Sequence, residues 1–188
     1  GPVLFQCRDL ARDSARLLVR HRDGTLTEDV FRNLPQYLPK NAVLIFNATK
    51  VIPARMALTK ETGGRVKILF IRMEGRYIRV LADRSLKPGM RLALTKNICF
   101  TVRQIDRSQY LLAPNFPLSA LPRLMQRHGS MPIPPYIRHT RLTESSIRRK
   151  YQTIFARHKG AVAAPTASLH FTDRLMDSLA REKIQKEF

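Results

Sequence analysis

The sequence has no tryptophan, only two cysteines and few acidic residues, and each scarcity removes a class of protein. Cys7 and Cys99 lie far apart and belong to no C-x-x-C or Cys/His cluster, so they predict neither a zinc site nor a disulfide framework. No apolar run approaches the roughly 18 residues that a membrane-spanning helix needs. We therefore expect a protein of the reducing cytoplasm, without a metal and without a membrane partner.

The shortage of acidic residues leaves a large positive charge. The chain has 34 Lys and Arg against 14 Asp and Glu, which gives a formal net charge of +20. A charge of this size indicates a polyanionic partner, and nucleic acid is the leading candidate. A membrane surface is a competing explanation, and a solvated basic surface without any partner is a third.

The 188 residues, 44% of them hydrophobic, are enough for one ordinary domain or two small ones. We interpret Gly1-Pro2 as the remnant of a protease site and leave it out of the fold. Residues 15–19 and 25–27 flank an Asp23-Gly24 turn and predict a hairpin. The continuous apolar run at residues 42–46 predicts a strand that is buried on both faces, as in an α/β sheet.

Short segments with alternating polarity dominate the middle of the chain, and Gly, Pro and Asn residues separate them. These segments are residues 56–60, 66–73, 77–82, 91–95, 98–105 and 110–113. Strands at this spacing predict a small antiparallel barrel or sandwich.

Helical patterns follow the predicted barrel. They cover residues 117–126, 147–155 and 173–183, with Thr143-Glu144-Ser145-Ser146 as the cap of the second. Residues 131–136 are too rich in proline for a helix and predict an extended linker. Residues 160–171 favour a strand and a tight loop.

Three sequence blocks, in order along the chain, carry a resemblance to a known family. They are VLIFNATKVIPAR at 43–55 with ETGGRV at 61–66, MPIPPYI at 131–137, and YQTIFARHKGAVAAPTASLHFT at 151–172. With these blocks the chain resembles the N-terminal half of the S-adenosylmethionine:tRNA ribosyltransferase-isomerases. The resemblance implies an α/β catalytic domain with an inserted small antiparallel β-barrel domain, α+β overall. Its expected parts are residues 3–56, the barrel at 57–130, and a return segment at 131–188.

The resemblance also implies a reaction. The family transfers the ribosyl group of S-adenosylmethionine, which is consumed as a substrate, onto 7-aminomethyl-7-deazaguanine in tRNA to give epoxyqueuosine. The implied partner is tRNA through its anticodon stem-loop, and no metal is required. An alternative is a non-catalytic, basic tRNA-binding module derived from the family. A basic structural or ribosome-associated protein would explain the charge but not the three blocks.

His170 is the candidate catalytic residue, because it is the one histidine in the AAPTASLHF part of the third block and an imidazole transfers protons near neutral pH. A histidine that is hydrogen-bonded in a core is the alternative. Thr166, next to Pro165, is a candidate for cofactor binding because its small neighbours permit a close approach of the backbone. Tight packing of small residues is the alternative there.

The other cofactor-binding candidates lie in the first two blocks. Arg55 carries a planar guanidinium that suits a carboxylate or phosphate, with a solvated arginine as the alternative. Asn47 and Thr49 are candidates either to bind the ligand or to cap the strand. Tyr136, in a rigid proline frame, is a candidate to stack on adenine or on an extruded base.

The tRNA-binding candidates belong to the third block and its approach. Aromatic stacking or hydrogen bonding is assigned to Tyr151, Gln152 and Thr153, with core packing as the alternative for the tyrosine. Phosphate contacts are assigned to basic residues that precede the block: Arg138, Arg148 and Arg149.

The match to the family is incomplete. Ala48, Lys50, Lys67 and Ser168 replace a commonly polar residue, arginine, glutamate and glycine of the family, in that order. A truncated α/β domain would also expose a sheet edge and apolar surface, so we expect self-association.

Overall fold

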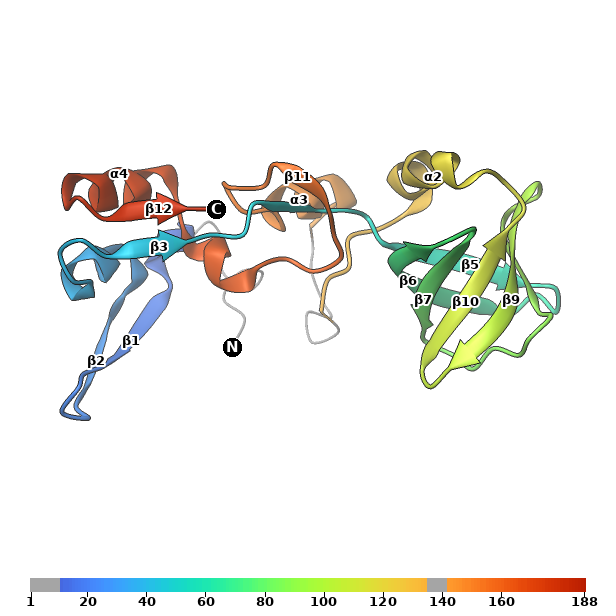
Figure 1. Cartoon of the computed structure of the whole chain (residues 1–188), viewed down its shortest axis with the longest axis horizontal. Coiled ribbons are helices and arrows are strands. Elements are labelled where there is room, and N and C mark those ends of the chain that lie inside the picture. Colours follow the sequence, from blue (N-terminus) through green and yellow to red (C-terminus); the bar gives the residue numbers. More distant parts are fainter. Residues whose placement is uncertain (1–10, 135–141) are drawn as a thin grey trace. The chain divides into compact units, whose positions relative to one another are not determined.

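The computed structural model describes residues 11–134 and 142–188, and it confirms an α+β fold (Figure 1). The chain divides into two compact units. One combines Gly1–Val51 with Ile133–Phe188, and the other is Ile52–Pro132. We call the first the α/β unit and the second the barrel unit.

The barrel unit is a closed antiparallel barrel of six strands in the order β10-β7-β6-β5-β8-β9. The strands are β5 (Arg55–Lys60), β6 (Arg65–Glu74), β7 (Tyr77–Ala82), β8 (Arg91–Thr95), β9 (Ile98–Asp106) and β10 (Gln109–Pro114). Alternate residues point inward, and side chains such as Phe100, Met56 and Leu112 are fully buried. All six predicted strand segments are therefore confirmed.

A short helix, α2 (Leu121–His128), packs against the barrel strand β5 after the 3₁₀ turn η3 (Leu118–Ala120). Leu121 and Met125 provide its buried face, as the predicted helix in this region requires. The chain then returns beside its own entry point, because Arg55 and Ser130 exchange backbone hydrogen bonds of 3.1 and 2.8 Å. The two ends of the barrel unit are thus held next to each other.

The described residues of the α/β unit form three two-stranded sheets. The predicted hairpin is confirmed as β1 (Arg16–Arg20) and β2 (Leu26–Val30). The other sheets are parallel pairs that join distant segments: β3 (Val43–Ile45) with β12 (Gln185–Glu187), and β4 (Thr49–Val51) with β11 (His158–Ala161). The remaining elements are η1 (Arg12–Ser14), η2 (Phe31–Tyr37), α3 (Glu144–Lys150), η4 (Thr166–His170) and α4 (Asp173–Arg181).

Aromatic side chains form much of the core of the α/β unit. The rings of Phe46, Phe155 and Phe171 pack together, with centroid separations of 4.2 Å for the first two and 4.8 Å between Phe46 and Phe171. The buried face of α4 adds Leu175 and Leu179. This cluster joins segments from both ends of the chain, so α4 is fixed by tertiary packing as well as by its own cap.

Three predictions in this unit need correction. The strand at 42–46 is not buried on both faces, because Val43 and Ile45 of β3 are 49% and 82% exposed. The helix predicted at 147–155 ends at Lys150, where Tyr151 takes the C-cap position and the chain turns. In place of the tight loop predicted within residues 160–171, Thr166–His170 form a 3₁₀ helix, because the amides of Ser168 and Phe171 bond to carbonyls three residues earlier.

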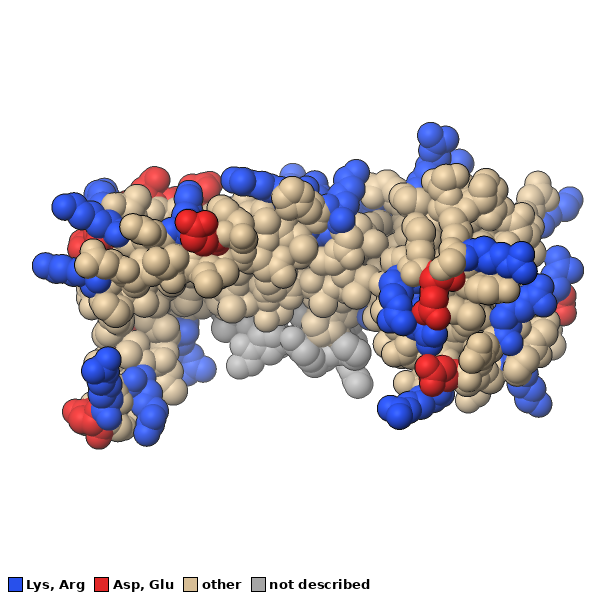
Figure 2. Space-filling model, viewed as in Figure 1, with Lys and Arg blue, Asp and Glu red and all other residues tan. Residues whose placement is uncertain are grey.

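The basic charge is widely distributed over the surface. On the face shown in Figure 2, lysines and arginines are found over the barrel and over the β1–β2 hairpin, with few acidic residues between them. Within the described residues, no helix is both long and apolar enough to cross a membrane.

Candidate functional site

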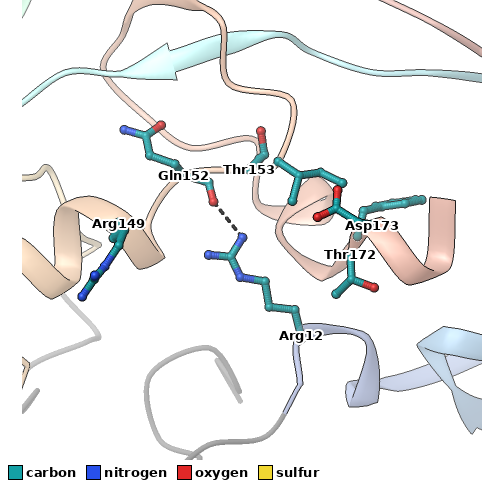
Figure 3. Close-up of a pocket in the computed structure, with 8 residues that line it drawn as sticks. Arg12, Arg149, Gln152, Thr153, Thr172 and Asp173 are labelled. Carbon is teal, nitrogen blue, oxygen red and sulfur yellow. Dashed lines mark hydrogen bonds between the residues drawn. The ribbon is translucent and has the colours of Figure 1, made fainter. Parts of the chain in front are cut away.

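A pocket of about 330 Å³ lies in the α/β unit where η1, the turn after α3 and the start of α4 meet (Figure 3). Its lining combines charged, hydroxyl and apolar side chains. The lining residues are Arg12, Arg149, Gln152, Thr153, Ile154, Phe171, Thr172 and Asp173. Five of these eight residues belong to the third sequence block, at 151–172.

Arg12 connects the start of the chain to the end of α3. Its Nη1 donates to the carbonyl of Gln152 at 2.8 Å, and its Nη2 donates to the carbonyl of Lys150 at 2.9 Å. The last carbonyls of a helix lack partners within the helix, and a cation there is also favoured by the helix dipole. Burial lowers the pKa of the Arg12 guanidinium, although an arginine remains protonated at neutral pH.

Gln152 joins the wall of the pocket to strand β4. Its side-chain Oε1 accepts from the amide of Val51 at 3.0 Å, and its Nε2 donates to the carbonyl of Val51 at 2.7 Å. The side-chain amide therefore imitates a neighbouring strand. Because both ends of this amide are occupied, the geometry favours a positioning role for the side chain of Gln152 over contact with a substrate.

A buried carboxylate holds η1 against the start of α4. Asp13 is 1% exposed and accepts from Thr172 Oγ1 at 2.8 Å and from Arg174 Nη2 at 2.9 Å. Burial would raise the pKa of Asp13, but the hydrogen bonds from Arg174 and Thr172 outweigh it and the pKa lies below its usual value. Thr172 Oγ1 also accepts from the amide of Leu175 and so caps α4.

The hydroxyl of Thr153 is the one buried side-chain polar atom among the described residues that has no hydrogen-bond partner. Thr153 is only 6% exposed and lies in the pocket wall. A buried polar group without a partner costs about 1–3 kcal/mol. Because this oxygen is itself shielded from solvent, the missing bond is a cost to stability and not a contact offered to a ligand in the pocket.

His170, the candidate catalytic residue, ends η4 beside the pocket. Its Nδ1 lies 3.3 Å from the carbonyl oxygen of Arg12, and its ring packs on Phe31 with centroids 5.2 Å apart. A carbonyl oxygen can only accept, so Nδ1 carries the proton and a neutral ring leaves Nε2 as its acceptor. This is the tautomer that a general base using Nε2 needs.

Of the other candidates, the structure places two on the same turn as His170, and it gives the others different surroundings. Pro165 and the exposed Thr166 begin η4, the same turn that carries His170. Asn47 Oδ1 accepts from the amide of Thr49 at 2.8 Å, which is the strand-capping alternative. Arg55 begins the barrel strand β5 rather than ending an α/β strand.

The tRNA-binding candidates also differ in their surroundings. Tyr151 is 3% exposed, which favours packing over stacking on a base. Arg148 forms an ion pair with Glu144 at 3.2 Å, whereas Arg149 is exposed and lines the pocket. Tyr136 and Arg138 lie outside the described residues.

Sequence reasoning missed Arg12 and Asp173 as site residues. The contacts of Arg12 with Gln152 and Lys150 span 140 and 138 positions, and no local pattern signals a contact of that range. Asp173 directly follows the third block and was interpreted only as the start of a helix. Its position directly after that block was the one feature of the sequence that could have suggested Asp173 as a site residue.

Across residues 11–134 and 142–188, no group of three or more His, Cys, Asp or Glu side chains is arranged to hold a metal ion.

With this fold and pocket established, the sequence places the chain in a family. Residues 6–188 match the model of the queuosine biosynthesis protein family, so the chain belongs to that family. The expected family resemblance is thereby confirmed.

Among its relatives are proteins named S-adenosylmethionine:tRNA ribosyltransferase-isomerase. The one from Aquifex aeolicus is 39% identical over 184 residues, which are 94% of this chain and 53% of the relative. The one from Acidithiobacillus ferrooxidans is 38% identical over 182 residues, which are 94% of this chain and 52% of the relative. The chain thus spans about half the length of the curated relatives it matches.

A solved structure is also similar. The crystal structure of an S-adenosylmethionine tRNA ribosyltransferase from Thermotoga maritima covers 99% of this chain and 54% of its own, with 22% identity and a TM-score of 0.38.

Proposed function

We propose that this chain contributes to a tRNA-modifying transferase-isomerase of queuosine biosynthesis, in which S-adenosylmethionine gives its ribosyl group to 7-aminomethyl-7-deazaguanine in tRNA. The observation that carries the proposal is the family match over residues 6–188. The pocket supports it, because the last sequence block of the resemblance ends in its wall.

In this proposal His170 is the general base. The reaction needs a proton to be removed next to the sulfonium, and the Nδ1 contact with Arg12 leaves Nε2 to accept it. Thr166 and Pro165, on the same 3₁₀ turn, are proposed to lie along the cofactor, together with Asn47, Thr49, Arg55 and Tyr136. These assignments rest on the family blocks in which the residues lie.

The proposed macromolecular substrate is tRNA, bound near its anticodon stem-loop in the cytoplasm. The net charge of +20 supports a polyanionic substrate. Phosphate contacts are proposed for Arg148, Arg149 and Arg138. Tyr151, Gln152 and Thr153, which the sequence assigned to base contacts, are instead proposed to support the site from the protein side, because Tyr151 and Thr153 are buried and Gln152 is bonded to Val51. If the phosphate contacts form, log K for tRNA falls linearly with log salt concentration, with a slope of about −0.7 to −0.9 per phosphate contact.

The proposed activity is tested by incubating the chain with S-adenosylmethionine and a tRNA that carries 7-aminomethyl-7-deazaguanine. We expect epoxyqueuosine in the digested tRNA by mass spectrometry, with adenine and methionine released in equal amounts. Binding of tRNA without any product, at all enzyme concentrations, would instead favour the non-catalytic RNA-binding alternative.

The role of His170 is tested with a matched pair of variants. In His170→Asn the side-chain amide nitrogen can replace Nδ1 as the donor to the Arg12 carbonyl, while the nitrogen Nε2 is lost. In His170→Gln the side-chain amide reaches the position of Nε2, while the donor at Nδ1 is lost. A general base at Nε2 predicts that His170→Asn binds S-adenosylmethionine normally but turns over about 10² to 10⁴ times more slowly. Equal turnover by His170→Asn and the unaltered chain would exclude His170 as the base.

A further inference from the structure

The pocket carries charges of both signs. Arg12 and Arg149 supply positive charge, Asp173 supplies negative charge, and Ile154 and Phe171 supply apolar surface beside them. Few small molecules match such a lining. An α-amino acid does, because its carboxylate and ammonium lie on one carbon and its side chain extends from the same point.

Arg12 has capacity for an anion. A guanidinium has five N–H donors, and the two hydrogen bonds recorded for Arg12 go to neutral backbone carbonyls. No carboxylate among the described residues forms an ion pair with it, although its side chain is half-buried. Bidentate binding of a carboxylate is the strongest interaction that such a group makes.

Asp173 has capacity for a cation. It is the first residue of α4 and is exposed, and no lysine or arginine of the described part of the chain forms an ion pair with it. The neighbouring Arg174 is already bound to Asp13. Figure 3 shows Arg12 and Asp173 approaching the pocket from different elements, η1 and α4.

Thr153 lines the pocket without offering it a polar contact. Its hydroxyl is shielded from solvent, and Figure 3 shows it turned away from Arg12. The pocket volume of about 330 Å³ is near the lower end of the range of about 300–1,000 Å³ for small-molecule sites, which suits one end of a larger ligand.

We propose that this pocket binds the α-amino-acid end of S-adenosylmethionine, with Arg12 on the carboxylate and Asp173 on the ammonium. The inference rests on the proposed function and specifies which part of the substrate the pocket recognises. Arg149 adds positive charge at the rim. The adenosine end then lies outside the group of residues that line this pocket.

The test compares ligands that differ only at the amino-acid end, using calorimetric titration of the unaltered chain. The ligands are S-adenosylmethionine, its decarboxylated form, methylthioadenosine, which lacks the amino-acid end, and methionine alone. We expect decarboxylation to weaken binding about 10- to 100-fold, the equivalent of losing one or two charged hydrogen bonds. Methionine should compete with S-adenosylmethionine for this pocket. Methylthioadenosine should bind without contacting this pocket, because it lacks the amino-acid end.

A variant on the protein side gives the complementary measurement. Asp173→Asn should weaken S-adenosylmethionine about tenfold while leaving the affinity for methylthioadenosine unchanged. The matched control is Asp177→Asn, one turn further along α4 and outside the pocket lining, which should change neither affinity. A fault in folding would lower both affinities together. Arg12→Lys keeps the positive charge but loses the planar guanidinium that can bind a carboxylate through two hydrogen bonds. It should therefore reduce the factor by which decarboxylation weakens the binding of S-adenosylmethionine.

The outcomes separate the two proposals. If decarboxylated and intact S-adenosylmethionine bind equally, or if an Asp173→Asn variant that thermal unfolding shows to be folded weakens both nucleosides alike, the amino-acid site is wrong even when turnover of tRNA is observed. If the chain forms epoxyqueuosine and discriminates against the decarboxylated ligand, both proposals stand. If neither turnover nor binding of S-adenosylmethionine occurs, the proposed function fails, and the amino-acid site fails with it.

Discussion

The barrel unit and the α/β unit use their strands in opposite ways. The barrel closes six strands of five to ten residues on themselves, so each strand has two neighbours. In the described part of the α/β unit the strands form only pairs, three to five residues long, and β3 leaves Ile45 82% exposed. The barrel is therefore organised around its own core, whereas the α/β unit is organised around long-range contacts that surround a pocket.

The strongest test of this contrast is the removal of a barrel core side chain. Phe100 is fully buried and packs edge-on against Phe116 at 5.4 Å. Phe100→Ala should lower the free energy of unfolding of the barrel by about 3–5 kcal/mol. Urea unfolding followed by amide NMR signals of residues 52–132 would measure it. Ile45→Ala is the control and should change stability by less than about 0.5 kcal/mol, and a large effect there would show that β3 is covered.

The closure of the barrel unit depends on Gly129. A Cβ at this position would lie 2.1 Å from the carbonyl oxygen of Pro53 and 2.4 Å from that of Met125. Both contacts are with backbone, so Gly129→Ala should destabilise the barrel unit by up to about 3 kcal/mol. Thermal unfolding would show it. Gly64→Ala is a matched control, since its nearest atoms would lie 3.8 Å away.

In the α/β unit, the carboxylate of Asp13 holds two segments together, η1 and the start of α4. Asp13→Asn should lower the free energy of unfolding by about 2 kcal/mol, below the figure for a fully buried pair because the Arg174 side chain is 66% exposed. The pKa of Asp13 is lowered in the folded chain, so its contribution is present above its unfolded pKa of about 4 and is lost as the pH falls through the folded pKa.

Urea titrations at neutral and acid pH would follow this loss. The difference between Asp13→Asn and the unaltered chain should shrink as the pH falls below about 4. A difference that persists unchanged in acid would show that the hydrogen-bonding shape of the side chain, rather than its charge, holds η1 against α4.

The smallest expected effect concerns the barrel surface. Arg79 binds Glu74 through Nε and Nη2 at 2.6 and 2.7 Å, and these contacts lower the pKa of Glu74 to about 2. Arg79→Gln should return that pKa towards its ordinary value, as measured by carboxyl NMR titration. Because the Glu74 carboxylate keeps contact with solvent, with its side chain 39% exposed, we expect little change in unfolding. A large loss of stability would place this ion pair among the supports of the barrel.

How far the sequence could predict each unit follows from the range of its contacts. The barrel strands were recognised because alternation and turns are local signals, and each hairpin pairs neighbours in sequence. The hydrophobic run at 42–46 gave the strand but not its exposure, because burial depends on what covers it. The end of α3 was missed because Tyr151 and Phe155 fit helical spacing, while Gln152 is drawn to Val51 from 101 residues away.

The candidate site shows the same limit. His170, Gln152 and Thr153 were marked by their sequence block and Arg149 by its basic charge just before it, whereas Arg12 could be connected to them only by tertiary structure. The roles assigned to these residues and the domain limits at 56 and 130 stay predictions. So does self-association, which no contact in the described part of the chain addresses.

The bridge between Arg55 and Ser130 also bears on how the chain folds. The barrel segment is continuous, so it can fold during synthesis before β12 has been made. Once it has folded, the bridge shortens the loop that the Gln152 contact with Val51 must close from 101 residues to roughly a quarter of that length. Two halvings of a loop save about 1 kcal/mol of closure entropy. The folded barrel thus lowers the entropy cost of bringing Gln152, which lines the pocket, into contact with Val51.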